Sequence, residues 1–260
     1  MDRCGRHTEA GIPLRELLHG TLFEEVVGES KMSGEMSLKV IAHIRSPFPG
    51  KFGIPRQSGR VPQILSKIVF TKEYRNADTL RGLDGFSHLW ILWQFSEVKS
   101  NSWSPTVRPP RLGGNQRMGV FATRSPYRPN PIGLSCVKIH RIVLNSPEGP
   151  YIEVLGADLM DNTPIYDLKP YLPHADVIPD AIGGFSDEVK EYHLSVKDPN
   201  GLLNSLPQEV SELIRGVLGE DPRPAYQTDK DREYAFECGG YGISFRVEGL
   251  DVILSKCEKL

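Results

Sequence analysis

Apolar and polar residues alternate with a period of two along much of the chain, which is the pattern of half-buried β-strands. Loops rich in proline, glycine and asparagine bound these segments, and almost no helical period lies between them. A parallel sheet needs intervening helices, so the pattern predicts a mainly β protein that begins with an antiparallel sheet or barrel. The strand-like segments are 38–45, 63–70, 86–95, 117–124, 134–144 and 151–159.

A second, smaller unit is predicted in the last third of the chain. Ser205 and Gln208 form a capping-box pattern ahead of an amphipathic helical stretch. A hairpin around Gly239 and Gly240 follows, and then a closing strand. We therefore expect a weakly structured N-terminal extension (1–37), an antiparallel β-barrel domain (38–183) and a small α+β C-terminal domain (184–260).

Composition narrows the class of protein. The 260 residues are 39% apolar and 25% charged, which is ordinary for a globular protein. The longest apolar runs, such as LWILW at 89–93, are far shorter than the roughly 20 residues of a membrane span, and no secretory signal pattern opens the chain. The four cysteines are scattered without a CxxC pair, which argues against a zinc site or a disulfide framework. We expect a cytoplasmic protein with reduced thiols, no metal and no membrane partner.

Charge is distributed unevenly although the formal net charge is only −2. The stretch 98–147 contains six arginines, two lysines and no acidic residue. A solvated basic face is the plainer interpretation of such a stretch. The excess of arginine favours an anionic ligand or nucleic acid, because the guanidinium fork matches phosphate and carboxylate better than an ammonium group does.

Familiar cofactor signatures are absent from the sequence, which has no GxGxxG between a strand and a helix, no Walker loop, no HExxH and no GxSxG. Several proline-stiffened loops carry arginine instead. Proline restricts the backbone before binding, so these loops can hold hydrogen-bond donors in place. The loops are IPRQ at 54–57, RPPRLGGNQR at 108–117, TRSPYRPNPIG at 123–133 and DPRPAY at 221–226.

For several other polar residues, a plain structural interpretation competes with a functional one. Arg56 by itself is typical of a surface residue, and His88, inside an apolar strand, is typical of a satisfied core group. Asp158 and Asp161 lie after a strand, where acids commonly cap turns, but their oxygens would also suit a ribose or a cationic centre. Arg223 could hold a phosphate and Tyr226 could stack on a base, which are the two contacts that recognition of single-stranded RNA most needs.

Long motifs in the chain resemble the TrmO (TsaA-like) family. They are PRQ at 55–57, RGLDGFSHLWIL at 81–92, TVRPPRLGGN at 106–115, GVFATRSPYRPNPIGLS at 119–135, DNTPIYDLKPYLP at 161–173 and DPRPAY at 221–226. The resemblance covers about residues 38–260. It implies a homodimeric tRNA adenine N6-methyltransferase that uses S-adenosyl-L-methionine and holds it in a β-barrel. Its substrate would be threonylcarbamoyl-adenosine next to the anticodon of threonine tRNA, with the C-terminal domain helping to hold the tRNA.

The resemblance also implies roles for individual residues. Asn162 stands where the family more often has glycine, and asparagine tolerates the same left-handed backbone. Cofactor contacts are expected at Pro55, Arg56, Gln57, His88, Leu89, Arg124, Leu134, Asp158, Leu159, Met160 and Asp161. Beyond the resemblance, we hypothesise phosphate contacts at Arg108, Arg111, Arg128 and Arg223, and a hydrogen bond from Asp221 or Tyr226 that orients the target base.

Two other functions fit the same residues. A basic barrel that binds tRNA without chemistry would show similar phosphate-binding loops, and it would have no reason to bind S-adenosylmethionine. A barrel methyltransferase acting on another substrate is the third possibility, and the DPRPAY motif argues against it.

Overall fold

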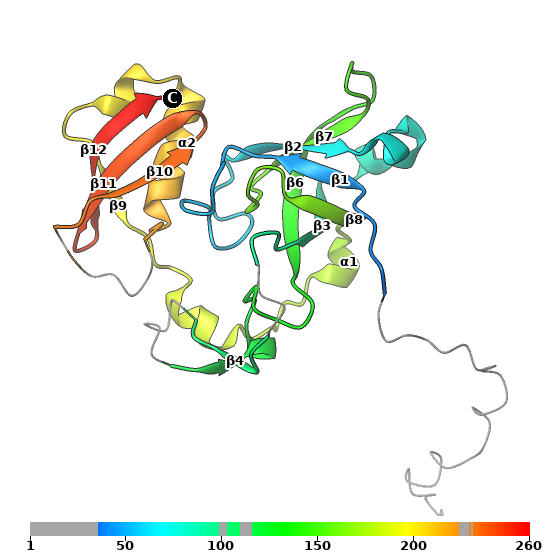
Figure 1. The fold of residues 1–260 in the computed structure, drawn as a ribbon, viewed down its shortest axis with the longest axis horizontal. Helices are drawn as coiled ribbons and strands as arrows, with labels where there is room; N and C mark the ends of the chain where they lie inside the picture. Colours follow the sequence, from blue (N-terminus) through cyan, green and yellow to red (C-terminus); the bar gives the residue numbers. More distant parts are fainter. Residues whose placement is uncertain (1–35, 99–102, 110–115, 224–228, 230) are drawn as a thin grey trace, which may run out of the picture. The chain divides into compact units, whose positions relative to one another are not determined.

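The computed structural model of the protein describes residues 36–98, 103–109, 116–223, 229 and 231–260 (Figure 1). The predicted N-terminal extension lies outside these residues except for 36 and 37. The chain divides after Leu38, and the helices and strands found among the described residues belong to the unit Lys39–Leu260. Among the described residues, no helix is both long enough and apolar enough to cross a membrane.

Six antiparallel strands close into a barrel, as the alternating pattern predicts. Their side chains alternate between a buried interior and an exposed exterior, because successive residues of a strand point to opposite faces. The interior is filled by aliphatic side chains such as Ile44, Ile91 and Ile152, none of which is exposed. In barrel order the strands are β1 (Ala42–Arg45), β2 (Leu65–Phe70), β7 (Tyr151–Leu155), β6 (Ile132–Val143), β3 (His88–Gln94) and β8 (Pro164–Pro170).

Two parts of the barrel domain differ from the prediction. β8 was not predicted, because its prolines and Asp167 are typical of a turn, yet it closes the barrel between β3 and β1. The segment 117–124 is not a full strand: β5 (Met118–Gly119) pairs with β4 (Thr106–Val107) over two residues only. The chain then turns into η5 (Val120–Ala122). Other short helices among the described residues are η1 (Lys72–Tyr74), η2 (Ala77–Leu80), η3 (Leu83–Gly85), α1 (Pro173–Asp176) and η6 (Gly184–Val189).

The C-terminal part is a four-stranded sheet with one helix against its inner face. Its predicted hairpin and closing strand are β10 (Tyr234–Cys238), β11 (Tyr241–Glu248) and β12 (Asp251–Lys259), and β9 (Ser195–Lys197) adds a parallel strand beside β12. The helix is α2 (Gln208–Gly219), preceded by η7 (Leu202–Ser205).

The predicted capping box of α2 is wrong. Pro207 is the residue that precedes the first helical turn, and no side chain caps it. The Ser205 hydroxyl instead donates to the Leu202 carbonyl within η7, and Gln208 pairs with Glu212 along the helix surface. The fixed φ of proline helps to set where this helix begins, and no side chain accepts from the amides of its first turn.

A loop between β1 and β2 packs against the C-terminal sheet and helix. Phe48 and Val61 from this loop share a core with Ile214 of α2 and Phe245 of β11. Gly53 adopts a left-handed φ of 95°, and a Cβ there would lie 2.4 Å from the Phe236 ring, so only glycine allows this close approach. The loop that carries the PRQ motif is therefore held from the C-terminal side.

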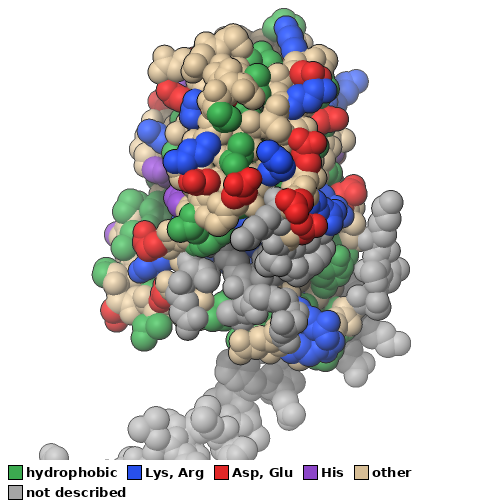
Figure 2. All heavy atoms as spheres, turned by 90° about the vertical axis from the view of Figure 1, so that its left-hand side faces the viewer, with side chains coloured by type: hydrophobic (Ala, Val, Ile, Leu, Met, Phe, Trp, Pro, Cys, Tyr) green, Lys and Arg blue, Asp and Glu red, His purple; other side chains and the backbone are tan. Residues whose placement is uncertain are grey.

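The face of the molecule that carries the C-terminal sheet has mixed charge. Figure 2 shows acidic and basic side chains interspersed over it rather than a continuous basic surface. Ion pairs such as Lys197–Asp251 and Lys256–Glu258 lie on this sheet. The outer face of the sheet is therefore poorly suited to follow a phosphate backbone.

Candidate functional site

A pocket of about 830 Å³ lies at the end of the barrel where β3 ends and β6 begins. Three loops that the sequence singled out meet around it: the PRQ loop, the TRSPYRPNP loop and the turn after β7. Its volume falls in the range of small-molecule and cofactor sites, roughly 300–1,000 Å³. The predicted cofactor residues that line it are Pro55, Arg56, Gln57, Arg124, Leu134, Asp158 and Met160.

Cationic side chains dominate the charge of the pocket wall. Lys51, Arg56, Arg124 and Arg128 line it. The Arg124 guanidinium donates a hydrogen bond to the Gln57 side-chain oxygen, which joins two motifs that lie 67 residues apart. This part of the pocket suits a carboxylate or phosphate, because guanidinium groups held by a neighbour lose little freedom on binding.

Hydrogen bonds within the TRSPYRPNP loop explain how it keeps its shape without a helix or sheet. The Arg128 guanidinium donates to the Thr123 carbonyl at 3.1 Å, and the Thr123 hydroxyl donates to the Val120 carbonyl at 2.9 Å. The Tyr127 amide donates to the Ser125 hydroxyl. Proline and these internal bonds together fix the loop that presents Arg124.

A buried chain of hydrogen bonds holds Asp158 in the pocket wall. The Trp93 indole N–H donates to the Ser135 hydroxyl at 2.9 Å, and that hydroxyl donates to the Asp158 carboxylate at 2.6 Å. Burial raises the pKa of Asp158 above its usual value, although the Ser135 hydrogen bond and the Arg124 charge act in the opposite direction. A buried carboxylate of this kind is stabilised by a cation or by donated hydroxyl groups.

Sequence reasoning missed Trp93 and Ser135 as parts of the site. Ser135 is 1% exposed and sits at an inward position of β6, among apolar neighbours. A serine at an inward position of a strand is a signal that a buried polar partner must exist, because a buried hydroxyl needs a hydrogen bond. The partner itself can be found only from the contacts.

Four of the predicted cofactor residues lie outside the pocket lining. His88 is at the opposite end of β3, where its ring contacts the Ser87 hydroxyl and packs against Tyr171. Leu89 and Leu159 are fully buried in the barrel core. Asp161 accepts a hydrogen bond from the Ser46 amide and pairs with Arg45.

The turn between Asp158 and β8 has the left-handed backbone that was expected at Asn162. Asn162 has a φ of 63°, in the left-handed region that asparagine tolerates. Its amide donates to the Ile44 carbonyl at 2.8 Å, so the turn is tied to β1. Asparagine at this position is therefore compatible with the turn.

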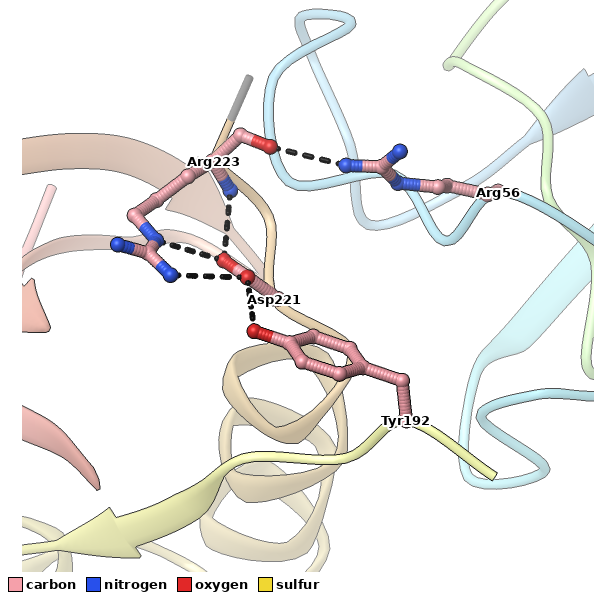
Figure 3. Close-up of polar contacts among 4 residues, drawn as sticks. All are labelled: Arg56, Tyr192, Asp221 and Arg223. Carbon is pink, nitrogen blue, oxygen red and sulfur yellow. Dashed lines mark hydrogen bonds and ion pairs between the residues drawn. The ribbon is translucent and has the colours of Figure 1, made fainter. Parts of the chain in front are cut away.

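The described part of the DPRPAY motif forms a compact polar turn after α2 (Figure 3). Both oxygens of the Asp221 carboxylate accept from the Arg223 guanidinium, at 2.8 and 3.0 Å, and the Tyr192 hydroxyl donates to one of them at 3.0 Å. Burial alone would raise the pKa of Asp221, but its hydrogen bonds with Arg223 and Tyr192 outweigh that effect and lower it. The turn reaches the pocket through Arg56, whose guanidinium donates to the Arg223 carbonyl at 2.9 Å.

The predicted phosphate-binding residues fall in different surroundings. Arg128 lines the pocket and Arg108 is exposed after β4. The Arg223 side chain is only 13% exposed and is occupied by Asp221. Arg111 and Tyr226 lie outside the described residues.

Comparison with known proteins agrees with the motifs. Residues 43–177 match the family model for the tRNA-methyltransferase O N-terminal domain, and residues 189–260 match the model for the TrmO C-terminal domain. The chain is 41% identical over 215 residues to the tRNA (adenine(37)-N6)-methyltransferase of Escherichia coli K12, covering 80% of this chain and 91% of that protein. It is 36% identical to an S-adenosyl-L-methionine-binding protein of Archaeoglobus fulgidus, over 55% of this chain and 94% of that one.

Solved structures agree as well. A crystal structure of TrmO from Pseudomonas aeruginosa superposes with a TM-score of 0.68 at 29% identity, covering 87% of this chain and 98% of that one. The matches to both family models together cover most of the chain, from the first barrel strand to the last residue. The chain therefore belongs to the TrmO family of tRNA methyltransferases.

Proposed function

We propose that the chain transfers a methyl group from S-adenosyl-L-methionine to N6 of the adenine next to the anticodon of tRNA, in the cytoplasm. The finer form of the proposal is that this adenine is the threonylcarbamoyl-adenosine of threonine tRNA. The observation that carries the proposal is the pocket where the PRQ loop, the TRSPYRPNP loop and the Asp158 turn meet. Relatives named as tRNA (adenine(37)-N6)-methyltransferase support the reaction and the RNA substrate.

The residues of the pocket fit the groups of S-adenosylmethionine. Arg124 and Arg56 supply guanidinium groups for the methionine carboxylate, and Gln57 orients the first of them. The buried Asp158 carboxylate suits the ammonium, the sulfonium or the ribose hydroxyls. Phe121 and Phe95 also line the pocket and add aromatic surface, which suits a purine ring. The pocket thus offers complementary side chains for the carboxylate, for one cationic or hydroxyl group and for the purine ring of the cofactor.

Methyl transfer to an exocyclic amine depends mainly on positioning. The cofactor supplies an electrophilic methyl group on a sulfonium centre. The protein must hold the amine nitrogen in line with that methyl and close to it, and such orientation lowers the barrier by several kcal/mol. Because the amine proton becomes acidic only as the methyl arrives, the reaction needs no strong base before attack.

The outer face of β3 and β6 supports the expected homodimer. Trp90 and Leu92 of β3 stand opposite Cys136 and Leu134 of β6, and Leu134 is 54% exposed. Leu134 also lines the pocket, so a second copy on this face would complete the pocket wall. Leu134→Glu is expected to shift the protein to a monomer in analytical ultracentrifugation and to weaken cofactor binding. Retention of the dimer by this variant would count against the face.

The proposal is tested by incubating the protein with threonine tRNA and labelled S-adenosylmethionine and then analysing the nucleosides by mass spectrometry. Label on threonylcarbamoyl-adenosine is the expected result. Label on a different nucleoside would indicate a methyltransferase with another substrate. Binding of tRNA without any binding of S-adenosylmethionine would indicate the non-catalytic RNA-binding protein.

Arg124 provides the residue-level test of the pocket. Arg124→Ala is expected to weaken S-adenosylmethionine binding about tenfold or more in calorimetry, since a charge-assisted hydrogen bond is lost. Arg81→Ala is the matched control, because Arg81 is an exposed arginine paired only locally with Asp78 in the structure described. Equal affinities for the two variants would remove Arg124 from the cofactor site.

A further inference from the structure

The PRQ loop and the turn after α2 are joined at two points, each through an arginine of the loop. The Arg56 guanidinium donates to the Arg223 carbonyl at 2.9 Å. The Arg60 guanidinium donates to the Glu220 carboxylate at 2.9 Å. We call these four residues the clamp. The two arginines lie four positions apart and their partners three positions apart, so residues 56–60 of the loop lie beside residues 220–223 of the turn.

The Glu220 side of the clamp is firmly built. The Glu220 side chain is 4% exposed, and its amide caps α2 by donating to the Gly216 and Val217 carbonyls. The second carboxylate oxygen lies 3.2 Å from a ring nitrogen of His193. Because a buried carboxylate with these partners is costly to displace, this side acts as the fixed point of the clamp.

The Arg223 side depends on a less ordinary backbone. Asp221 has a φ of 51°, a left-handed conformation that costs a non-glycine residue about 1 kcal/mol. The contacts drawn in Figure 3 offset this cost, because the Asp221 carboxylate receives the Arg223 guanidinium, the Arg223 amide and the Tyr192 hydroxyl. Tyr192 is the member of this group that comes from outside the turn, in the segment between η6 and β9.

We propose that Tyr192 is a positioning residue for the methyl transfer: its hydroxyl holds Asp221, the turn of Asp221 and Arg223 thereby keeps its shape, and the Arg223 carbonyl places the Arg56 guanidinium in the pocket wall. In this arrangement Asp221 is an anchor and not a base, since both of its oxygens are occupied. The inference rests on the proposed function. It adds a residue outside every motif quoted above and gives the route by which it acts.

This series of contacts matters because it connects the cofactor pocket with the motif that is expected to bind RNA. Arg56 lines the cofactor pocket, and Arg223 belongs to the DPRPAY motif that is expected to meet the RNA. A change in the shape of the turn therefore changes the pocket wall at Arg56. Tyr192 would determine both the shape of the turn and the position of Arg56, although its own side chain does not line the pocket.

The test compares Tyr192→Phe with Tyr151→Phe, which makes the same chemical change at a distant place. The Tyr151 ring lies on the barrel beneath the Lys67 ammonium, 4.2 Å from its centre. Hydrogen exchange followed by mass spectrometry is measured on both variants without any substrate. Tyr192→Phe is expected to speed exchange both in the peptide spanning 219–223 and in the peptide spanning 53–60, whereas Tyr151→Phe leaves both unchanged. Faster exchange in 219–223 alone would overturn the proposal, because the effect would not reach the loop.

Enzyme kinetics separate positioning from a general loss of structure. Tyr192→Phe is expected to raise the KM for S-adenosylmethionine roughly three- to tenfold, the loss of one partly exposed hydrogen bond to a charged group. Its melting temperature should fall by only about 2–4 °C, which leaves the protein folded in the assay. The same substitution in an Arg56→Ala background is expected to have little further effect on KM, because the two residues act along one route. An equal increase in both backgrounds would overturn the proposal. Failure of the wild-type protein to methylate tRNA would refute the proposed function and leave the exchange result interpretable.

Discussion

Gly133 is predicted to be irreplaceable because of the tryptophan that lies against it. The residue is opposite Trp93 in the β3–β6 ladder. A Cβ at this position would lie 2.2, 2.4 and 2.6 Å from three atoms of the indole ring. These atoms belong to the rigid fused ring, so the ring would have to move by about 1 Å to restore ordinary contact. Gly133→Ala therefore tests whether the ring is held as the structure shows.

The cost of the substitution has two parts. Forcing a side chain out of a packed position costs about 1–3 kcal/mol. The displaced indole also loses its 2.9 Å hydrogen bond to Ser135, which contributes about 1 kcal/mol. The expected loss of about 2–4 kcal/mol in the free energy of unfolding corresponds to a drop of roughly 5–15 °C in melting temperature for a unit of this size. Cofactor affinity should fall as well, because Ser135 holds Asp158 in the pocket.

Scanning calorimetry and urea unfolding measure the effect, and Gly119→Ala serves as the control. A Cβ at Gly119 meets no atom within 4 Å, so this variant should keep or slightly gain stability. Trp93→Phe combined with Gly133→Ala should be less destabilised than the sum of the single variants, since the smaller ring leaves room for the methyl group. A Gly133→Ala protein that melts within about 2 °C of the wild type would refute the reasoning.

Three further outcomes follow from the pKa shifts. Asp158→Asn should raise the melting temperature at pH 7, because burial raises the pKa of Asp158 and its ionised form opposes folding. The same variant should weaken S-adenosylmethionine binding in calorimetry, and a variant that binds normally would contradict the role of Asp158 in the pocket. The lowered pKa of Asp221 means that its ion pair with Arg223 stabilises the fold above about pH 5 and that this contribution is lost as the pH falls through the lowered pKa. Asp221→Asn should accordingly be less stable than the wild type at pH 7, with the gap closing toward pH 3 in urea titrations, and a constant gap would contradict the linkage. Burial raises the pKa of the Cys238 thiol to about 12, so iodoacetamide at pH 8 should label Cys257 before Cys238 in peptide mass spectra, and equal rates would contradict this burial.

The barrel could be predicted from local patterning, with one informative exception. Residues 86–95 alternate because every second side chain enters the core, and this periodicity is visible in the sequence without any neighbour. β8 has no such signature, since Pro164, Asp167 and Pro170 resemble a turn. Its pairing with β3 and β1 becomes favourable only when those strands stand on either side of it, which is a property of the closed barrel.

The same division applies to the candidate site. Proline-stiffened loops bearing Arg56, Arg124 and Arg128 were predicted as a binding surface, and the structure places all three around one pocket. His88 and Leu89 were expected at the same site because of their motif, but they lie elsewhere in the barrel. Motif membership alone therefore does not tell which residues of a strand line a pocket, because only one end of the strand reaches it.

The sequence by itself determined the strands, the basic loops and the family of this protein, since strand periodicity, proline placement and motif identity are all properties of neighbouring residues. Only the tertiary structure decided that hydrogen bonds link Trp93, Ser135 and Asp158 in series. It also decided that Tyr192 holds Asp221 and that Arg56 joins the pocket to the C-terminal turn. Hydrogen bonds of this kind join residues tens or more than a hundred positions apart. Their formation depends on distances and burial that exist once the chain has folded, and no local pattern records them.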